Sequence, residues 1–244
     1  MARVLMPLAT KDFDPTETGV PWDVFARAGV EVVFATEDGK PGACDPLMIT
    51  GSLFGQLGAT PENVAKYRAM EQTPAFRAPI RYAEIDPSRF DLLLLPGGHA
   101  KGMRQYLESK TLQEKVAAFF AAKKPVAAIC HGGVVLARSV DPVTGRSVVA
   151  GRRMTALTKS LERTAYWISA WKLGDYYRTY PEYVQDEVVR ALGDAKLFET
   201  GPFFASYGNP FTVRDGNLLT ARWPGDASRF AAEALAMMNE RASG

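Results

Sequence analysis

Residues 126–133 read V-A-A-I-C-H-G-G, and this stretch decides the fold. A short apolar run ends at Cys130, and His131 and two glycines follow at once. An apolar strand that turns directly into a glycine-led helix is typical of an open parallel α/β sheet, in which ligands bind beyond the carboxyl ends of the strands. The chain places one of its two cysteines and one of its two histidines at this corner. The stretch therefore predicts a parallel α/β fold and a reactive site at the strand-to-helix corner that Cys130 occupies.

Strand and helix patterns alternate along the rest of the chain. The expected strands are 3–8, 30–36, 90–95, 126–129 and 217–221, with two short strands or a hairpin within 147–158. The expected helices are 20–28, 62–72, 111–122, 132–139, 161–173, 182–192 and 227–239. This alternation predicts one domain over residues 1–244, a three-layer αβα sandwich with a mainly parallel sheet. The glycine- and proline-rich stretch at about 40–85 is expected to be an irregular insertion over one edge or end of that sheet.

Composition narrows the class of protein. The 244 residues are 47% hydrophobic and 23% charged, as in an ordinary globular domain with a sizeable core. A net charge of +2, with no basic run longer than two, gives no reason to expect binding to nucleic acid. No signal peptide or membrane span is expected, so the predicted location is the cytoplasm, with Cys44 and Cys130 as free thiols. Neither CxxC nor HxxxH spacing occurs, and no metal is expected.

Two strand ends carry the residues that could do chemistry. His99 follows L-L-L-L-P-G-G, and His131 follows V-A-A-I-C. Glycines after a strand permit tight turns, and the backbone N–H groups around Gly97, Gly98 and His131 are candidates to hold a substrate oxygen. Cys130 stands at a strand-to-helix corner like the nucleophile elbow of α/β hydrolases. A helix N-terminus there is expected to lower the pKa of the thiol and favour the thiolate.

Structural explanations compete with these functional ones. A lone cysteine after an apolar strand is more often a small buried hydrophobe than a nucleophile. For His99, a role in substrate binding and a purely structural role, as a loop histidine hydrogen-bonded to the backbone, are about equally well supported. The adjacent histidine, the two following glycines and the second strand end with P-G-G-H together favour a reactive Cys130.

Longer motifs resemble a known family. These are D-P-T-E-T-G-V-P-W at 14–22, F-A-T-E-D-G at 34–39, F-D-L-L-L-L-P-G-G-H-A at 90–100, K-P-V-A-A-I-C-H-G at 124–132 and D-G-N-L-L-T-A-R-W-P-G at 215–225. The chain resembles the ThiJ/PfpI superfamily, whose fold is flavodoxin-like and similar to class I glutamine amidotransferases. It most resembles the branch of heat-shock chaperone and glyoxalase III proteins.

The resemblance implies roles for individual residues. Cys130 would be the nucleophile, His131 its basic neighbour, and Glu17 an acidic residue that shares a proton with the sulfur. Members of this branch carry an acid about 30 residues beyond the cysteine to orient the histidine. In this chain Lys159 stands where some relatives would have that acid, and Glu162 is the nearest carboxylate, with a solvated helix surface as its equal alternative.

These roles favour a cofactor-independent enzyme that acts on a small aldehyde. The leading hypothesis is a glyoxalase III-like hydro-lyase that converts methylglyoxal or glyoxal to lactate or glycolate, or a related deglycase. The alternatives are a cysteine amidase or peptidase, an isonitrile hydratase-like enzyme, and a redox-sensing holding chaperone without catalysis. The superfamily implies a homodimer.

An aromatic stretch at 166–181 stands apart from these motifs. Trp167 and Trp171 are four residues apart on one helical face, which predicts core packing. Tyr176, Tyr177 and Tyr180 are candidates for a pocket wall or a dimer contact.

Overall fold

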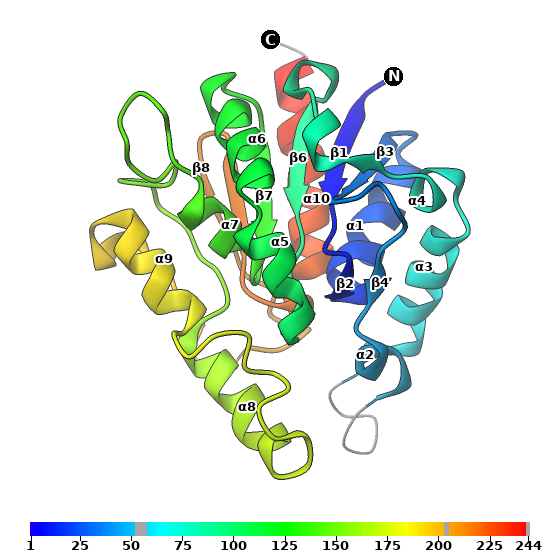
Figure 1. Ribbon diagram of the computed structural model, residues 1–244, viewed down its shortest axis with the longest axis vertical. Helices are drawn as coiled ribbons and strands as arrows, with labels where there is room; N and C mark the ends of the chain where they lie inside the picture. Colours follow the sequence, from blue (N-terminus) through cyan, green and yellow to red (C-terminus); the bar gives the residue numbers. More distant parts are fainter. Residues whose placement is uncertain (52–57, 203–204, 243–244) are drawn as a thin grey trace.

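The computed structural model describes residues 1–51, 58–202 and 205–242 (Figure 1). Seven strands form one sheet in the spatial order β5-β3-β1-β6-β7-β9-β8. All neighbours in this sheet are parallel except β8, which runs antiparallel to β9 at the edge. The strands are β1 (Arg3–Pro7), β3 (Glu31–Thr36), β5 (Ile80–Arg81), β6 (Leu92–Leu95), β7 (Val126–Ile129), β8 (Thr212–Asp215) and β9 (Leu218–Ala221). The mainly parallel sheet confirms the predicted fold class.

Helices cover both faces of this sheet (Figure 1). One face carries α1 (Pro15–Arg27) and α10 (Ala227–Ala242), with α3 (Pro61–Glu71) packed on α1. The other face carries α5 (Arg104–Glu108), α6 (Lys110–Ala121) and α7 (Gly132–Arg138), with α9 (Val184–Leu192) packed on α7. Two further helices, α2 (Pro46–Thr50) and α8 (Lys159–Leu173), lie beyond the carboxyl ends of the strands (Figure 1). None of the helices in the described ranges is long and apolar enough to cross a membrane.

The core lies along the central strands. Every residue of β6 and β7 is buried, and both strands are entirely apolar. A parallel strand that is covered on both faces needs apolar side chains on both, which explains the uninterrupted runs L-L-L-L and V-A-A-I. These two rigid strands place the loops that follow them side by side, because Leu95 is paired with Ala128 at their carboxyl ends.

The prediction of two short strands or a hairpin within 147–158 is wrong. Only isolated bridges occur in that region of the described chain, between Val140 and Ser147 and between Met154 and Phe198. The edge strand β8 was not predicted, because T-V-R-D lacks a clear alternation of apolar and polar residues. Helix α1 begins at Pro15, five residues before the predicted start, because the Asp14 carboxylate caps its first turn.

The stretch at about 40–85 contains more regular structure than predicted. The expected helix there is α3, and α4 (Pro74–Arg77) follows it. β5 extends the main sheet beyond β3, and β4 (Ala43–Cys44) pairs with β2 (Lys11–Phe13) in a small second sheet. Residues 52–57 of this stretch lie outside the described residues.

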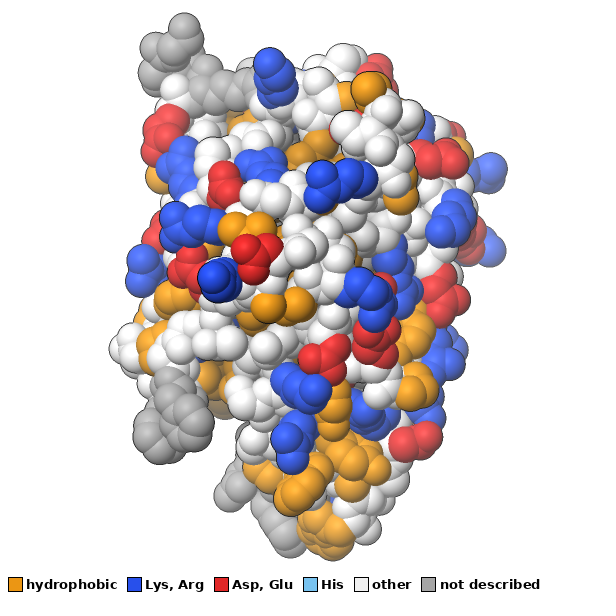
Figure 2. Space-filling model, turned by 90° about the vertical axis from the view of Figure 1, so that its left-hand side faces the viewer, with side chains coloured by type: hydrophobic (Ala, Val, Ile, Leu, Met, Phe, Trp, Pro, Cys, Tyr) orange, Lys and Arg blue, Asp and Glu red, His pale blue; other side chains and the backbone are white. Residues whose placement is uncertain are grey.

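The core assignment of the two tryptophans of α8 is also wrong. Trp167 is 69% exposed and Trp171 is 72% exposed, and Ile168 beside them is 47% exposed. Figure 2 shows hydrophobic side chains gathered at the lower end of the molecule, where α8 lies. The four-residue spacing predicted a common face correctly, but no other element of the described chain covers that face.

Candidate active site

Cys130 occupies a strained corner between β7 and α7. Its φ is +57°, in the left-handed region that costs a non-glycine residue about 1 kcal/mol or more. Its N–H donates to Ala221 O on β9 at 3.1 Å, and its carbonyl accepts from Gly133 N at 3.2 Å. These bonds hold both sides of the corner and fix the direction of the side chain. The thiol is fully buried.

Gly97, in the loop after β6, makes this corner possible. A Cβ at Gly97 would lie 2.6 Å from His131 N and 3.0 Å from Cys130 Cβ, so only glycine fits there. The Gly97 N–H donates to Glu17 Oε2 at 2.8 Å, and the Gly97 carbonyl accepts from Asp14 N at 2.9 Å. The loop after β6 therefore fastens the start of α1 beside the sulfur and brings Glu17 to Cys130, 113 positions away in the sequence.

Glu17 is a buried carboxyl with only part of its bonding capacity used. It is 0% exposed, and its Oε1 has no hydrogen-bond partner in the described structure. Burial first, and then the charge of Asp14, raise the pKa of Glu17 well above its usual range. Glu17 lies in the first turn of α1, where an acidic residue is often exposed, but its side chain faces the core.

The pKa of the Cys130 thiol is raised, which corrects the expectation of a lowered value. Burial is the largest cause, and the negative charges of Glu17 and Asp14 add to it. The His131 backbone N–H acts in the opposite direction but does not overcome burial. Two buried acidic groups in contact cannot both ionise near neutral pH, so Cys130 and Glu17 together hold at most one negative charge.

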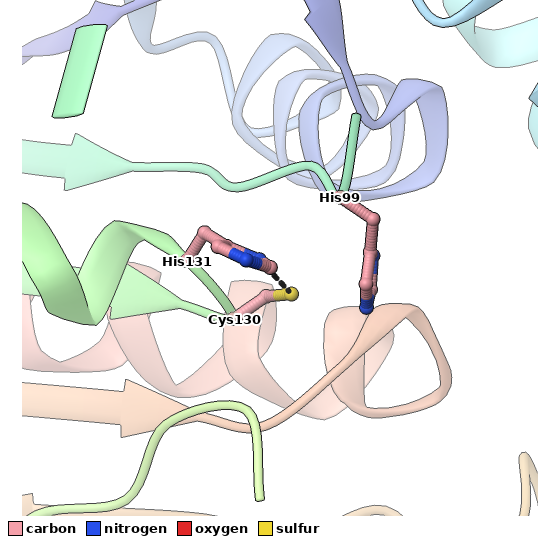
Figure 3. A group of neighbouring side chains, drawn as sticks. All are labelled: His99, Cys130 and His131. Atoms are coloured by element: carbon pink, nitrogen blue, oxygen red, sulfur yellow. Dashed lines mark hydrogen bonds between the residues drawn. The ribbon is translucent and has the colours of Figure 1, made fainter. Parts of the chain in front are cut away.

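His131 is the immediate partner of the sulfur. Its Nδ1 lies 3.5 Å from Cys130 Sγ (Figure 3), and its ring is buried. Burial, with smaller effects of His99 and Arg138, lowers the pKa of His131 well below its usual value, so the imidazole is neutral. Its Nε2 has no partner in the described structure. A neutral ring beside the thiol can accept its proton.

His99 stands between this buried pair and a cavity. Its ring lies edge-to-face with that of His131 (Figure 3), with a distance of 5.0 Å between the ring centroids. The centroid of the Tyr177 ring lies 6.2 Å from that of His99. Burial lowers the pKa of His99 to about 4. A cavity of about 510 Å³ beyond the strand ends has His99 in its wall, together with Met48, Thr60, Leu161, Ile168, Tyr207 and Trp223. His99 is the one member of the His99–Cys130–His131 group that reaches this cavity.

The backbone N–H groups predicted to bind a substrate oxygen differ in whether they already donate a hydrogen bond. The Gly97 N–H is engaged by Glu17, whereas the Gly98 N–H donates no hydrogen bond in the described structure. The His131 N–H faces the Cys130 sulfur. The Gly97 N–H therefore holds the Glu17 carboxyl, and the role of Gly98 and His131 as donors to a substrate oxygen stays a prediction.

The structure does not bring Glu162 to His131. The Glu162 carboxylate is buried on α8, accepts from Val184 N at 3.0 Å, and lies 3.5 Å from Arg178 Nη1. No hydrogen bond joins it to His131 among the described residues. Burial raises the pKa of Glu162 to about 7, against the opposing effects of Val184 and Arg178. Its contacts fasten α8 to the start of α9.

Two other acids near the site were not singled out from the sequence. Asp14 caps α1 through Thr16 N at 2.7 Å and Glu17 N at 3.1 Å, and burial raises its pKa to about 6. An aspartate directly before a proline is the signature of a helix start and gave a usable signal. Asp226 forms a fully buried ion pair with Arg222 after β9, and only burial distinguishes it from an ordinary i, i+4 surface pair.

Comparisons with known proteins agree with this architecture. The family model described as ThiJ/PfpI family-like matches residues 8–192. The chain belongs to this family. The match spans every residue of the Glu17–Cys130–His131 group and both glycine-bearing strand ends.

Relatives cover almost the whole chain. Glyoxalase 3 of Candida albicans is 26% identical over 97% of this chain and 98% of its own. The glutathione-independent glyoxalase HSP31 of Saccharomyces cerevisiae is 25% identical over 91% of this chain and 90% of its own. The crystal structure of glyoxalase III from Candida albicans superposes with a TM-score of 0.69 at 22% identity and covers 97% of both chains, which confirms the shared fold.

Proposed function

We propose that this protein is a cofactor-independent, glyoxalase III-like enzyme in which Cys130 attacks a small 2-oxoaldehyde such as methylglyoxal. One observation carries the proposal. Glu17 and His131 both adjoin the buried Cys130, and each keeps a buried polar atom without a partner, Oε1 and Nε2. Buried polar atoms are nearly always paired, so unpaired ones beside a strained cysteine are available to contact a substrate. The names of the two whole-length relatives support the same assignment.

The first step joins the sulfur to the aldehyde. The sulfur forms a bond to the aldehyde carbon, the carbonyl π pair moves to oxygen, and the thiol proton passes to His131. The new alkoxide, facing the N–H groups of Gly98 and His131, takes this proton from the His131 imidazolium to give a hemithioacetal and a neutral imidazole. Burial raises the pKa of the free thiol, so this proton transfer must accompany the attack.

The second step moves one proton between the two substrate carbons. The Glu17 carboxylate removes the hydrogen from the carbon that bears sulfur, and the carbonyl π pair of the adjacent carbon moves to its oxygen, which gives an enediolate. The resulting Glu17 carboxylic acid returns the proton to that adjacent carbon, the hydroxyl proton of the sulfur-bearing carbon passes to the enediolate oxygen, and the product is a lactoyl thioester. A carboxyl with a raised pKa suits this task, because its carboxylate is a stronger base than that of an ordinary glutamate.

Water completes the cycle. His131 removes a proton from water, the hydroxide attacks the thioester carbon, and the carbon–sulfur bond breaks to release the lactate product. The leaving sulfur takes the proton from His131, which restores the Cys130 thiol and the neutral imidazole. The sum is methylglyoxal plus water to lactate, with no redox change, and this net hydration classes the enzyme with the hydro-lyases. Glyoxal would give glycolate by the same steps.

The central test is lactate formation from methylglyoxal by the purified protein, without glutathione and with a chelator present. Wild type is expected to produce lactate and Cys130→Ala to produce none. Cys44→Ala is the matched control, because Cys44 is the other cysteine and is also buried. No lactate from wild type, or equal turnover by Cys130→Ala, would reject the proposal. A holding chaperone without catalysis would form no lactate here and would suppress aggregation of a heated client protein in a separate assay.

We also propose a cytoplasmic homodimer. The exposed Trp167 and Trp171 on α8 support an interface, because an apolar patch of this kind is usually covered in the assembled protein. Sedimentation of wild type against Trp167→Ser/Trp171→Ser tests it. The dimer predicts a shift to monomer in the double variant, and monomeric wild type would contradict it.

A further inference from the structure

We propose that His99, Cys130 and His131 form a binding site for one thiophilic divalent cation, such as Zn²⁺, which reversibly blocks the reactive thiol. One ligand atom from each of the three side chains lies within 4.8 Å of the others. One thiolate and two imidazoles are a ligand set that zinc and similar cations prefer. The sequence analysis expected no metal, because the ligands do not follow CxxC or HxxxH spacing: His99 lies on a different loop, 31 positions before Cys130.

The distances already approach those of a tetrahedral site. Zinc binds sulfur at about 2.3 Å and imidazole nitrogen at about 2.0–2.1 Å, which places neighbouring ligand atoms about 3.5 Å apart. Cys130 Sγ and His131 Nδ1 are 3.5 Å apart. His99 faces the same sulfur from the loop after β6 (Figure 3) and has to close the remaining gap. This movement is open to it, because His99 is only partly buried and borders the cavity.

The surroundings of His131 bear on how tightly a cation would be held. The His131 ring is 1% exposed, and its Nε2 has no hydrogen-bond partner in the described structure. A histidine in a permanent metal site almost always donates its other N–H to a carboxylate or carbonyl, and loss of such a partner weakens metal binding about 10–100-fold. The fold provides ligands without this support, so we infer reversible occupancy.

Binding changes one bond at the sulfur. The Cys130 S–H proton leaves to solvent, and the sulfur lone pair forms the bond to the cation, with both imidazoles bound as neutral ligands. The sulfur then has no free pair for a carbonyl carbon. Inhibition of turnover follows only if the proposed function holds, whereas the binding itself does not depend on it.

The test uses Co²⁺ as an optical probe of the purified full chain. A thiolate bound to Co²⁺ gives a near-ultraviolet charge-transfer band, and Zn²⁺ is expected to abolish that band by displacement. We expect one Co²⁺ per chain in wild type and in the control Cys44→Ser, no band in Cys130→Ser, and binding weakened about tenfold or more in His99→Gln. In parallel, Zn²⁺ is expected to protect Cys130 of wild type from alkylation by iodoacetamide.

Each other outcome counts against the site. A missing band with unprotected Cys130 in wild type overturns it, as does a band that persists in Cys130→Ser. Unchanged affinity in His99→Gln removes His99 and leaves an ordinary cysteine–histidine pair, which also overturns the three-ligand site. If the optical titration succeeds while wild type forms no lactate, the site stands and the proposed function fails.

Discussion

The segments that follow the neighbouring strands β9 and β7 both bury ionisable side chains, but only the segment after β9 pairs them completely. After β9, Arg222 and Asp226 form a fully buried ion pair with contacts of 2.9 Å from Nε to Oδ2 and from Nη2 to Oδ1. The backbone N–H groups of Phe211 and Arg222 donate to the same carboxylate. After β7, which pairs directly with β9, Cys130 is flanked by groups that keep unpaired atoms.

The difference separates stability from chemistry. A buried ion pair with complete hydrogen bonding fixes the path of the chain, and removal of one partner leaves an uncompensated charge. Unpaired groups contribute less to stability but are free to bind or exchange protons with a substrate. Substitutions after β9 should therefore lower the free energy of unfolding, whereas substitutions around Cys130 should lower activity.

Glu17→Gln is expected to cause the largest change. The amide keeps the shape and the acceptor for the Gly97 N–H but cannot carry the proton, so kcat should fall about 10²–10⁴-fold. The free energy of unfolding should stay equal or rise, because a buried ionisable group is replaced by a neutral one. Lactate assays and urea unfolding measure the two. Glu162→Gln is the matched control at the other fully buried glutamate on a helix; activity of Glu17→Gln within threefold of wild type would remove Glu17 from the mechanism.

Asp226→Ala should reverse this pattern. It leaves Arg222, 1% exposed, without its counter-charge, and the free energy of unfolding should fall by about 3–5 kcal/mol in urea titrations. Glu233→Ala breaks a half-exposed pair with Arg229 and should cost less than about 1 kcal/mol. Equal losses in the two variants would show that the buried pair has no special role.

Glu162→Gln should have the smallest effect on activity, but it should measurably change how the free energy of unfolding depends on pH. The pKa of Glu162 rises from 4.5 to about 7 on folding, so between these values the folded state binds more protons than the unfolded state. Wild-type stability should therefore fall as pH rises through this window, by about 3 kcal/mol from this group, and the variant should lack that contribution. Urea unfolding of both proteins at about pH 5 and about pH 8 measures the difference. A loss of activity above about tenfold would instead support the role in orienting His131.

The sequence predicted those features that depend on residues close together in the chain. The run at 126–133 contains its own strand, corner and helix start, so the fold class and the place of Cys130 followed from it. Glu17 depended on family motifs, because nothing local shows that a first-turn acid faces the core. Its position follows from the hydrogen bond with Gly97, 80 residues away.

Burial was the property that could not be predicted. The α8 pattern placed Trp167 and Trp171 on one face correctly, but a face becomes core only when another element covers it. Burial also reversed the expected direction of the Cys130 thiol pKa, because desolvation and the nearby carboxylates outweigh the favourable end of α7. Glu162 was the carboxylate nearest in sequence to the position where relatives carry the acid, yet it accepts a hydrogen bond from the N–H of Val184 at the start of α9.

The most direct measurement is ¹³C NMR of the Glu17→Gln variant mixed with methylglyoxal labelled at the aldehyde carbon. If Cys130 attacks and Glu17 transfers the proton, the spectrum should show a protein-bound hemithioacetal carbon and no lactate. The signal should be absent from Cys130→Ala. Lactate formation by Glu17→Gln at the wild-type rate, or no bound carbon in the variant, would contradict the account.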